Sequence, residues 1–269
     1  MKNTQFKNKV VLITGSSQGI GKTTAELMLK AGAKVVINAR NEKLLWETYD
    51  ELSQWGDVLP VPGDMGKWAD VQNLVNQTLA HFGRLDILIS NAGLKFEDSF
   101  RRTTPEMLQK IIQVNFLGKV FSIKAAFDAL VESQGSIILI GSLAGLYGLP
   151  GASIYSSSKM ALAAMQQSLE AELAPHGVHI GLMYVGFTES DEHSGIMNGA
   201  GVKQEIPERN MKRQSREHVA GAILRMIENR ISRKVMTPLG VAFDILRVIA
   251  PGLLRVILKR RTRELEPIL

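Results

Sequence analysis

Three side chains in the middle of the chain have the types and spacing needed for acid–base chemistry. Ser142 follows an apolar run at 136–140, Tyr155 comes thirteen residues later, and Lys159 lies four residues beyond Tyr155. Residues four apart share one face of a helix, so the Lys159 ammonium group would lie close to the Tyr155 phenol. A Tyr–Lys pair at this spacing is also common by chance on a surface, so its meaning depends on what surrounds it.

The chemistry that these groups suit is proton transfer to an oxygen atom. Hydride transfer to a carbonyl carbon produces an alkoxide, which needs a proton as it forms. A phenol with a pKa of about 10 is poorly matched to neutral pH, and a nearby ammonium group lowers that pKa. A shift of about three units corresponds to about 4 kcal/mol. We therefore expect Tyr155 to act as acid/base with its pKa lowered by Lys159, while Ser142 donates a hydrogen bond to the substrate oxygen.

A glycine-rich loop lies far upstream of these residues. Residues 14–21 read Thr-Gly-Ser-Ser-Gln-Gly-Ile-Gly, between an apolar run at 9–13 and a helical pattern from about 21 to 31. Glycines at a first strand–helix turn let the backbone approach a pyrophosphate, which then lies at the positive end of the helix. The alternative is a glycine-rich turn without a ligand. The expected cofactor-binding residues are Gly15, Ser16, Ser17, Gln18, Gly19, Ile20 and Gly21.

The TGxxxGIG loop, taken with Ser142, Tyr155 and Lys159, resembles the short-chain dehydrogenase/reductase family over about residues 8–190. The resemblance implies a single dinucleotide-binding fold in which Tyr155 is the acid/base and Lys159 also binds the nicotinamide ribose. It further implies that Asn115, a lone amide in an apolar helical segment, bends the helix and holds a water that links Lys159 to solvent. Helix interiors disfavour Asn, although Asn115 could also be a tolerated buried amide.

The residues after the second expected strand bear on the choice of nucleotide. An acidic side chain at position 39 would accept hydrogen bonds from the ribose hydroxyls of NAD, but the residue there is Ala39. The next residue is Arg40, and a guanidinium group can bind a phosphate through two parallel charge-assisted hydrogen bonds. We therefore expect NADP(H), with Arg40 and Asn41 at the nucleotide. The alternative is that Arg40 is a solvated loop cation.

Further cofactor contacts are implied by the resemblance. Asp64 and Met65 follow the third expected strand, where the family contacts the adenine amino group. Asn91, Ala92 and Gly93 follow the fourth, beside the adenine ribose.

The chain departs from the family pattern after the sixth expected strand. The family has Pro-Gly there and a hydroxyl residue four positions beyond the glycine. Here the proline is replaced by Val185 before Gly186, and the hydroxyl groups are those of Thr188 and Ser190. We expect nicotinamide contacts from this segment, and the choice between Thr188 and Ser190 stays open.

The order of apolar runs and helical patterns predicts the elements that position these groups. Strands are expected at 9–13, 34–38, 57–61, 85–90, 136–140 and 178–184, and helices at 21–31, 41–55, 67–82, 104–131, 153–174 and 216–229. This alternation predicts an α/β fold, a doubly wound parallel sheet (Rossmann fold) that binds ligands at the carboxyl ends of its strands. We expect one catalytic domain at 1–235, including a polar, aperiodic substrate lid near 189–215, and an amphipathic basic tail at 236–269.

Composition excludes several other classes of protein. The 269 residues are 45% hydrophobic and 22% charged, which is typical of a globular protein, and there is no cysteine for disulfides or thiolate metal sites. No metal site is expected. Residues 230–263 contain nine basic residues and one acid, so the positive net charge of +6 comes from this segment. The rest of the chain is not basic, and a nucleic-acid-binding face is therefore not expected. The N-terminus lacks a signal-peptide pattern, so we expect a cytoplasmic location, with peripheral membrane contact as a second possibility.

The tail has two interpretations. Residues 238–258 are apolar but interrupted, which predicts two short amphipathic helices in place of a spanning helix. The second helix would carry Arg255, Lys259 and Arg263 as a basic stripe. We favour packing over the substrate cleft or a neighbouring subunit. The alternative is shallow insertion at an anionic membrane surface. The interruptions are Asp244, Arg247, Pro251, Gly252 and Arg255.

Together these patterns predict an NADP(H)-dependent oxidoreductase that interconverts a carbonyl group and a secondary alcohol. Met197, Ile206 and Met211 in the expected lid favour an apolar substrate, such as a lipid, a steroid-like ketone or a 3-oxoacyl compound. The rival is a non-catalytic dinucleotide-binding sensor or scaffold, which would not need the Ser-Tyr-Lys set. The long helices at 104–131 and 153–174 resemble the family's subunit-pairing helices, which implies a homodimer or homotetramer.

Overall fold

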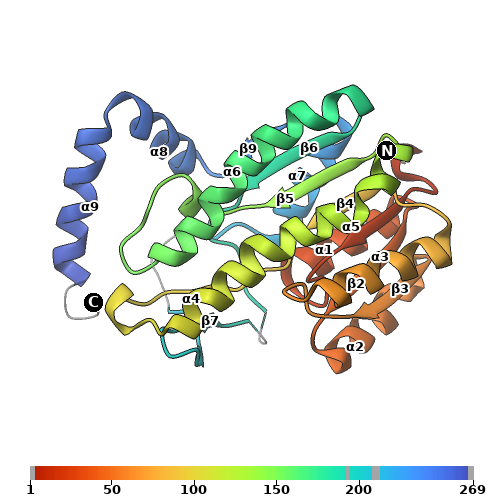
Figure 1. Cartoon of the computed structure of the whole chain (residues 1–269), viewed down its shortest axis with the longest axis horizontal. Coiled ribbons are helices and arrows are strands. Elements are labelled where there is room, and N and C mark those ends of the chain that lie inside the picture. Colours follow the sequence, from red (N-terminus) through yellow and green to blue (C-terminus); the bar gives the residue numbers. More distant parts are fainter. Residues whose placement is uncertain (1–3, 192–193, 208–212, 266–269) are drawn as a thin grey trace.

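The computed structural model describes residues 4–191, 194–207 and 213–265. Strands and helices alternate along the first two thirds of the chain, as predicted (Figure 1). The strands are β1 (Val10–Ile13), β2 (Lys34–Ala39), β3 (Val58–Pro62), β4 (Ile87–Ser90), β5 (Ser136–Ile140), β6 (His179–Tyr184), β7 (Ile196–Met197), β8 (Lys203–Gln204) and β9 (Arg233–Val235). The helices are α1 (Gly19–Lys30), α2 (Glu42–Leu52), α3 (Trp68–Phe82), α4 (Pro105–Ile112), α5 (Gly118–Glu132), α6 (Ser153–Leu173), α7 (Arg216–Glu228), α8 (Pro238–Ile249) and α9 (Pro251–Leu265).

Seven of the strands form one parallel sheet in the order β3-β2-β1-β4-β5-β6-β9. The order reverses between β1 and β4, and such a reversal opens a crevice at the carboxyl ends of the two strands. The doubly wound α/β prediction is confirmed. The edge strand β9 was not predicted, because it is only three residues long and two of these are exposed basic residues.

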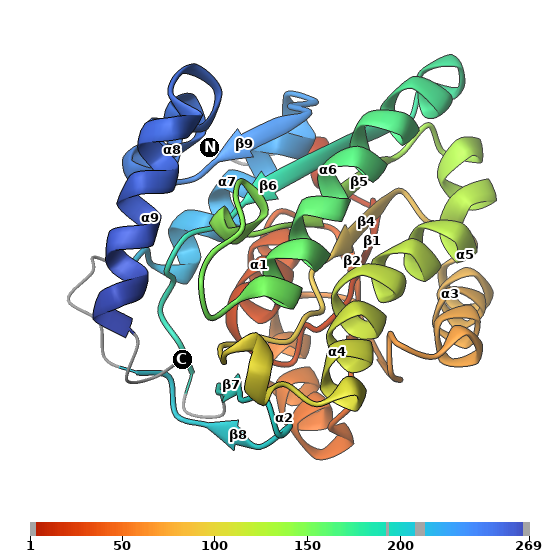
Figure 2. The same cartoon turned by 60° about the vertical axis from the view of Figure 1, so that its left-hand side comes forward.

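Both faces of the sheet are covered by helices (Figure 2). In β1, Val11 and Ile13 face the core that includes α1 and α7, whereas Val10 and Leu12 face the core that includes α3, α5 and α6. Successive side chains of a strand point to opposite faces, so a strand buried on both sides is apolar throughout. Two hydrophobic cores therefore hold the sheet between its helix layers.

The predicted helix at 104–131 is interrupted. Thr104 caps α4 through its side chain, and Pro105 occupies the first turn. The segment Gln113–Leu117 is then a π-helical turn, after which α5 begins at Gly118. A π-helical turn widens the helix and re-aims its side chains. Asn115 lies within this turn, at the position where the family resemblance implies a bend.

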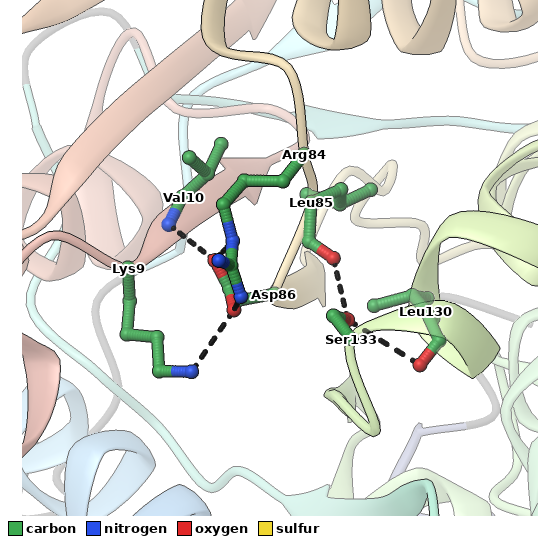
Figure 3. A network of polar contacts seen from close by, with 7 residues as sticks. All are labelled: Lys9, Val10, Arg84, Leu85, Asp86, Leu130 and Ser133. Carbon is green, nitrogen blue, oxygen red and sulfur yellow. Dashed lines mark hydrogen bonds and ion pairs between the residues drawn. The ribbon is translucent and has the colours of Figure 1, made fainter. Parts of the chain in front are cut away.

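A buried carboxylate ties the starts of the two central strands together (Figure 3). Asp86, just before β4, accepts hydrogen bonds from the Val10 N–H at 2.9 Å and from Lys9 Nζ at 3.0 Å. Arg84 donates two more, from Nε at 2.9 Å and Nη2 at 2.6 Å. Nearby, Ser133 Oγ donates to the Leu85 carbonyl at 2.7 Å and so attaches the end of α5. These bonds fix β4 beside β1 at the end of the sheet opposite the crevice.

The tail forms two helices, α8 and α9, as predicted, and Pro251 begins the second of them. Phe243 of α8 lies edge-on to Tyr147, with ring centres 6.1 Å apart, and Leu254 of α9 is buried. Among the residues that the structure describes, no helix is long and apolar enough to cross a membrane.

Candidate active site

A cleft of about 960 Å³ lies at the carboxyl ends of the parallel strands. Loops after β1 to β6 all contribute to its wall, because parallel strands present those ends at one edge of the sheet. The predicted residues in the wall are Gly15, Ser17, Gln18, Gly19, Ile20, Arg40, Asn41, Asp64, Met65, Asn91, Ala92, Gly93, Ser142, Tyr155, Lys159, Val185, Gly186, Thr188 and Ser190. Three predicted residues, Ser16, Gly21 and Asn115, do not line the cleft and lie behind its wall.

The glycine loop forms a close-fitting cradle. Gly15 has a φ of +64°, and a Cβ there would lie 2.8 Å from Ala92 Cα. Gly19 has a φ of +59°, and a Cβ on Gly21 would clash with the Gly15 carbonyl oxygen. The buried Ser16 hydroxyl donates to the Ile13 carbonyl at 2.7 Å and accepts from the Asn38 N–H at 2.9 Å. The loop therefore holds its backbone N–H groups at the start of α1, as a dinucleotide pyrophosphate requires.

A second layer of polar contacts behind this loop was not predicted. Thr14 Oγ1 accepts from the N–H groups of Asn91 and Ala92, at 3.0 and 3.1 Å. Asn91 Nδ2 returns hydrogen bonds to the Thr14 and Gly15 carbonyls, at 3.0 and 2.8 Å. The Asn38 amide joins the loops after β1 and β3. An Asn at the end of an otherwise apolar strand was the available signal.

Arg40, Asn41 and Asp64, which we expect at the adenosine half of the cofactor, belong to the part of the cleft wall that follows β2 and β3. Arg40 Nη1 is 3.9 Å from Asp64 Oδ2, and about half of the Arg40 side chain is exposed. Asp64 Oδ1 accepts from the Gly66 N–H at 2.9 Å, which shapes the turn after β3. Asn41 lines the cleft, but its side chain caps α2 by accepting from the Leu44 N–H at 3.2 Å. Arg40 thus presents a half-exposed guanidinium group at the cleft wall.

Ser142, Tyr155 and Lys159 meet in the middle of the cleft. Ser142 follows β5, and its hydroxyl accepts from the Ala144 N–H at 3.2 Å and shares a hydrogen bond with Tyr155. Lys159, one turn after Tyr155 on α6, donates from Nζ to the Ile140 carbonyl at 3.4 Å. Its Nζ lies 5.7 Å from the centre of the Tyr155 ring. The predicted spacing therefore brings a hydroxyl, a phenol and an amine together.

The pKa values of this group differ from the prediction. Burial raises the pKa of Tyr155 above 10, and the hydrogen bond with Ser142 offsets only part of this shift. Burial also lowers the pKa of Lys159 to about 8. The net lowering of the Tyr155 pKa that we expected does not occur in this structure, because desolvation of the phenolate outweighs the stabilising contacts. The Tyr155 phenol is therefore protonated at neutral pH.

Two buried groups on the interrupted helix support the site from behind. Asn115 Oδ1 accepts from the Leu94 N–H at 2.7 Å, and its Nδ2 donates to the Leu94 carbonyl at 3.1 Å. This pairing holds the chain just after Gly93. Lys119, one turn later, is fully buried and donates to the Ser90 carbonyl. Burial and the charge of Lys159 lower the Lys119 pKa well below its ordinary value. A lysine in an apolar helical segment was the signal that sequence reasoning missed.

The segment expected to be a lid contributes several residues to the wall of the cleft. Strands β7 and β8 pair as a short hairpin, and Ile206 lines the cleft. Met197 packs with Phe96 in a small apolar cluster, while Met211 lies outside the described residues. Lys95 was not predicted; its Nζ donates to Ser190 Oγ at 3.3 Å, and burial and then Arg213 lower its pKa. Within the described ranges, no cluster of His, Cys, Asp or Glu could hold a metal ion.

Comparisons with known proteins agree with this geometry. The family model for short chain dehydrogenases matches residues 9–201. The 11-beta-hydroxysteroid dehydrogenase-like protein 2 of Arabidopsis thaliana is 36% identical over 201 residues, covering 71% of this chain and 64% of the relative. A human 3-oxoacyl-[acyl-carrier-protein] reductase is 33% identical over 185 residues, covering 68% of this chain and 77% of that protein.

A solved structure shows the same fold. The short chain dehydrogenase/reductase of Burkholderia phymatum, in complex with NAD, superposes with a TM-score of 0.81 at 24% identity, covering 92% of this chain and 95% of that one. The family model spans more than half of the chain, and its matched segment contains the glycine loop, Ser142, Tyr155 and Lys159. The chain therefore belongs to the short-chain dehydrogenase/reductase family of oxidoreductases.

Proposed function

We propose that the protein is an NADP(H)-dependent oxidoreductase that interconverts a carbonyl group and a secondary alcohol. The observation that carries this proposal is the convergence of Ser142, Tyr155 and Lys159 on the same cleft as the glycine cradle. A dinucleotide held in that cradle supplies or accepts the hydride. The protein's own task is then to bind the substrate oxygen and to move one proton.

Each polar group of the set has a distinct role in the reductive direction. The Ser142 hydroxyl donates a hydrogen bond to the substrate oxygen and orients it. Tyr155, whose raised pKa keeps it protonated, transfers its phenolic proton to that oxygen. Lys159, with a pKa of about 8, is mostly an ammonium ion at neutral pH and stabilises the phenolate that remains. Oxidation of an alcohol uses the same groups in reverse.

The choice of NADP(H) is supported by charge at the end of β2. Ala39 offers no carboxylate to the ribose hydroxyls, and Arg40 presents a half-exposed guanidinium group to the cleft. An arginine can bind a 2′-phosphate through charge-assisted hydrogen bonds. The NAD bound in the Burkholderia protein belongs to that protein, so the nucleotide preference of this chain needs its own measurement.

For the substrate we propose an apolar carbonyl compound. Leu149, Pro150 and Ile206 line the same cleft as Tyr155, and apolar side chains favour apolar ligands. Relatives named for steroid and 3-oxoacyl chemistry support the same class. A steroid ketone, a 3-oxoacyl thioester and a long-chain ketone are the first compounds to test.

The test is oxidation of NADPH with this panel by the unmodified protein and by Tyr155→Phe. We expect turnover from the unmodified protein and a loss of at least about a thousandfold in kcat for the variant, because the ring stays and only the proton donor is removed. Binding of NADPH, followed by fluorescence, should change little. Tyr49→Phe on α2 is the matched control and should keep full activity.

Two outcomes would contradict the proposal. If Tyr155→Phe retains most of the turnover, the assignment of Tyr155 as the proton donor is wrong. If the unmodified protein binds NADPH but reduces no compound in a broad panel, a non-catalytic sensor or scaffold is favoured.

A further inference from the structure

The outer face of α8 is apolar and exposed. Side chains three or four residues apart lie on one face of a helix, and four exposed apolar residues of α8 (Val241, Ile245, Val248 and Ile249) follow this spacing, while Leu239 is exposed in the first turn. Val248 and Ile249 are 68% and 73% exposed, the highest values among them. The opposite face carries Gly240 and Phe243, which pack against Leu143 and Tyr147 of the loop after β5. The exposed residues are Leu239, Val241, Ile245, Val248 and Ile249.

Helix α9 continues this surface. Leu253, Val256 and Ile257 are exposed and again follow helical spacing, while Leu254 between them is buried. We name these three residues, together with the five of α8, the tail surface. Helix α9 runs from α8 toward the end of the molecule that carries α4, β7 and β8 (Figure 2). Helix α9 therefore runs toward strands β7 and β8, of which Ile196 and Lys203 line the cleft.

The charges around the tail surface are almost all positive. Arg255, Lys259 and Arg260 are exposed on α9, and none of them forms an ion pair within the described part of the chain. The acid of α8, Asp244, is already bound by Arg233 at 2.5 Å and Arg247 at 2.8 Å. Between residues 245 and 263 the sequence has six basic residues and no acid. The surface therefore needs a partner that is apolar and negatively charged.

A groove of about 420 Å³ between α7, β9 and α8 adjoins the tail surface and repeats this chemistry. Val241 belongs to both, and Met226 and Met236 add apolar lining. Arg225 and Lys234 lie at the same groove. Basic groups thus flank the apolar residues on more than one side.

We propose that the tail surface binds an anionic lipid surface by shallow insertion. Its apolar residues would lie at the boundary between headgroups and acyl chains, and Arg255, Lys259 and Arg260 would bind lipid phosphates. Spanning is excluded for the described helices, since α8 and α9 have 12 and 15 residues and about 20 are needed. A second copy bound through the same face would bring like charges together across a two-fold interface. Lipid supplies both the apolar and the anionic component.

Flotation of the full chain with vesicles tests this proposal. We expect binding to phosphatidylcholine vesicles that contain phosphatidylserine, strongest at low salt, and weak binding to pure phosphatidylcholine vesicles. The triple variant Arg255→Gln, Lys259→Gln, Arg260→Gln should lower the partition coefficient on anionic vesicles roughly a hundredfold. The variant Ile245→Gln, Val248→Gln should lower binding to both vesicle types, because it removes apolar area.

The matched control changes the same net charge elsewhere. Lys43→Gln, Lys67→Gln, Lys124→Gln removes three exposed cations from α2, the start of α3 and α5, and should lower binding only slightly. NADPH oxidation and thermal melting report that each variant is folded. The proposal is overturned if the full chain stays unbound on anionic vesicles at low salt, or if the control variant loses as much binding as the tail variant. It is also overturned if light scattering shows that Ile245→Gln, Val248→Gln dissociates an oligomer while vesicle binding is unchanged.

Discussion

At the scale of single residues, Lys159 connects pH to nucleotide binding. Burial lowers its pKa to about 8, so the ammonium form is present below that pH and is lost as the pH rises through it. We expect the affinity for NADPH to be constant near pH 7 and to fall above pH 8, since a neutral amine binds ribose oxygens and nearby phosphates less strongly. Equilibrium binding between about pH 7 and 9.5 measures this dependence.

Variants identify which amine is responsible. Lys159→Met should bind NADPH weakly at every pH and lose the decrease above pH 8. Lys119→Met removes the neighbouring buried amine, which does not line the cleft, and should keep the decrease. A pH dependence that persists in Lys159→Met would assign the titration to another group.

Arg40 should determine the nucleotide preference. We expect the unmodified protein to prefer NADPH over NADH at least about tenfold in kcat/KM, which is about 1.4 kcal/mol and modest for a charge-assisted phosphate contact. Arg40→Ala should reduce this ratio mainly by raising the KM for NADPH. Lys43→Ala, which removes a highly exposed cation three residues away, is the control. Equal effects of the two substitutions would show that general charge, not Arg40, attracts the nucleotide.

At the scale of elements, the π-helical turn Gln113–Leu117 holds the cleft through one amide. Asn115→Ala leaves the Leu94 N–H and carbonyl without their present partners, and a buried unpaired polar group costs about 1–3 kcal/mol. We expect urea unfolding to show a loss of this size together with a higher KM for NADPH, because Leu94 follows Gly93 in the cleft wall. Asn76→Ala makes the same change at an exposed position of α3 and should leave both quantities nearly unaltered. If the free energy of unfolding falls by the expected amount while the KM for NADPH is unchanged, Asn115 has only a structural role.

Most elements could be predicted because their buried faces leave a periodic pattern in the sequence. Strand β1 is apolar at every position since both its faces are covered. The misses are elements without such a pattern. Strand β9 has two exposed basic residues, and its pairing partner β6 lies far back along the chain. Strands β7 and β8 pair with each other, but with two residues each they are too short to leave a periodic pattern. The π-helical turn depends on the contact with Leu94, which no helical periodicity contains.

The candidate site also has features that could be predicted from the sequence and features that could not. Residues at strand ends could be placed in one cleft, because parallel topology alone brings Ser142, Asn91 and Gly15 together. The pKa of Tyr155 could not be predicted, since it depends on how far the folded chain excludes water from the phenol. Lys119 acts from behind the wall and matches no motif. Thr14 belongs to the TGxxxGIG loop, but its contacts with the Asn91 and Ala92 N–H groups depend on the folded chain. The domain boundary at 235, the homo-oligomer and the cytoplasmic location stay predictions.

At the scale of the whole molecule, Asp86 joins the two halves of the sheet at the β1–β4 boundary (Figure 3). Burial raises the pKa of this carboxyl group, but hydrogen bonds from Arg84, the Val10 N–H and Lys9 outweigh it, and the net pKa lies below the ordinary value. The carboxylate form therefore stabilises the folded state. That stabilisation is complete above the unfolded pKa of about 3.9 and is lost as the pH falls through the lower, folded value.

Asp86→Asn should therefore lower the free energy of unfolding by about 1.5–3 kcal/mol at pH 7, the range for hydrogen bonds to a charged group. The amide keeps the size of the side chain but cannot accept from all of the present donors, and the Val10 N–H is buried. Urea unfolding at pH 7 and then at steps below pH 4 measures the difference from the unmodified protein. This difference should shrink with acid, because the unmodified protein loses its carboxylate while the variant has none to lose. Asp128→Asn, an exposed position on α5, should change stability little at either pH. A difference for Asp86→Asn that stays constant below pH 4 would mean that packing, and not charge, holds β4 against β1.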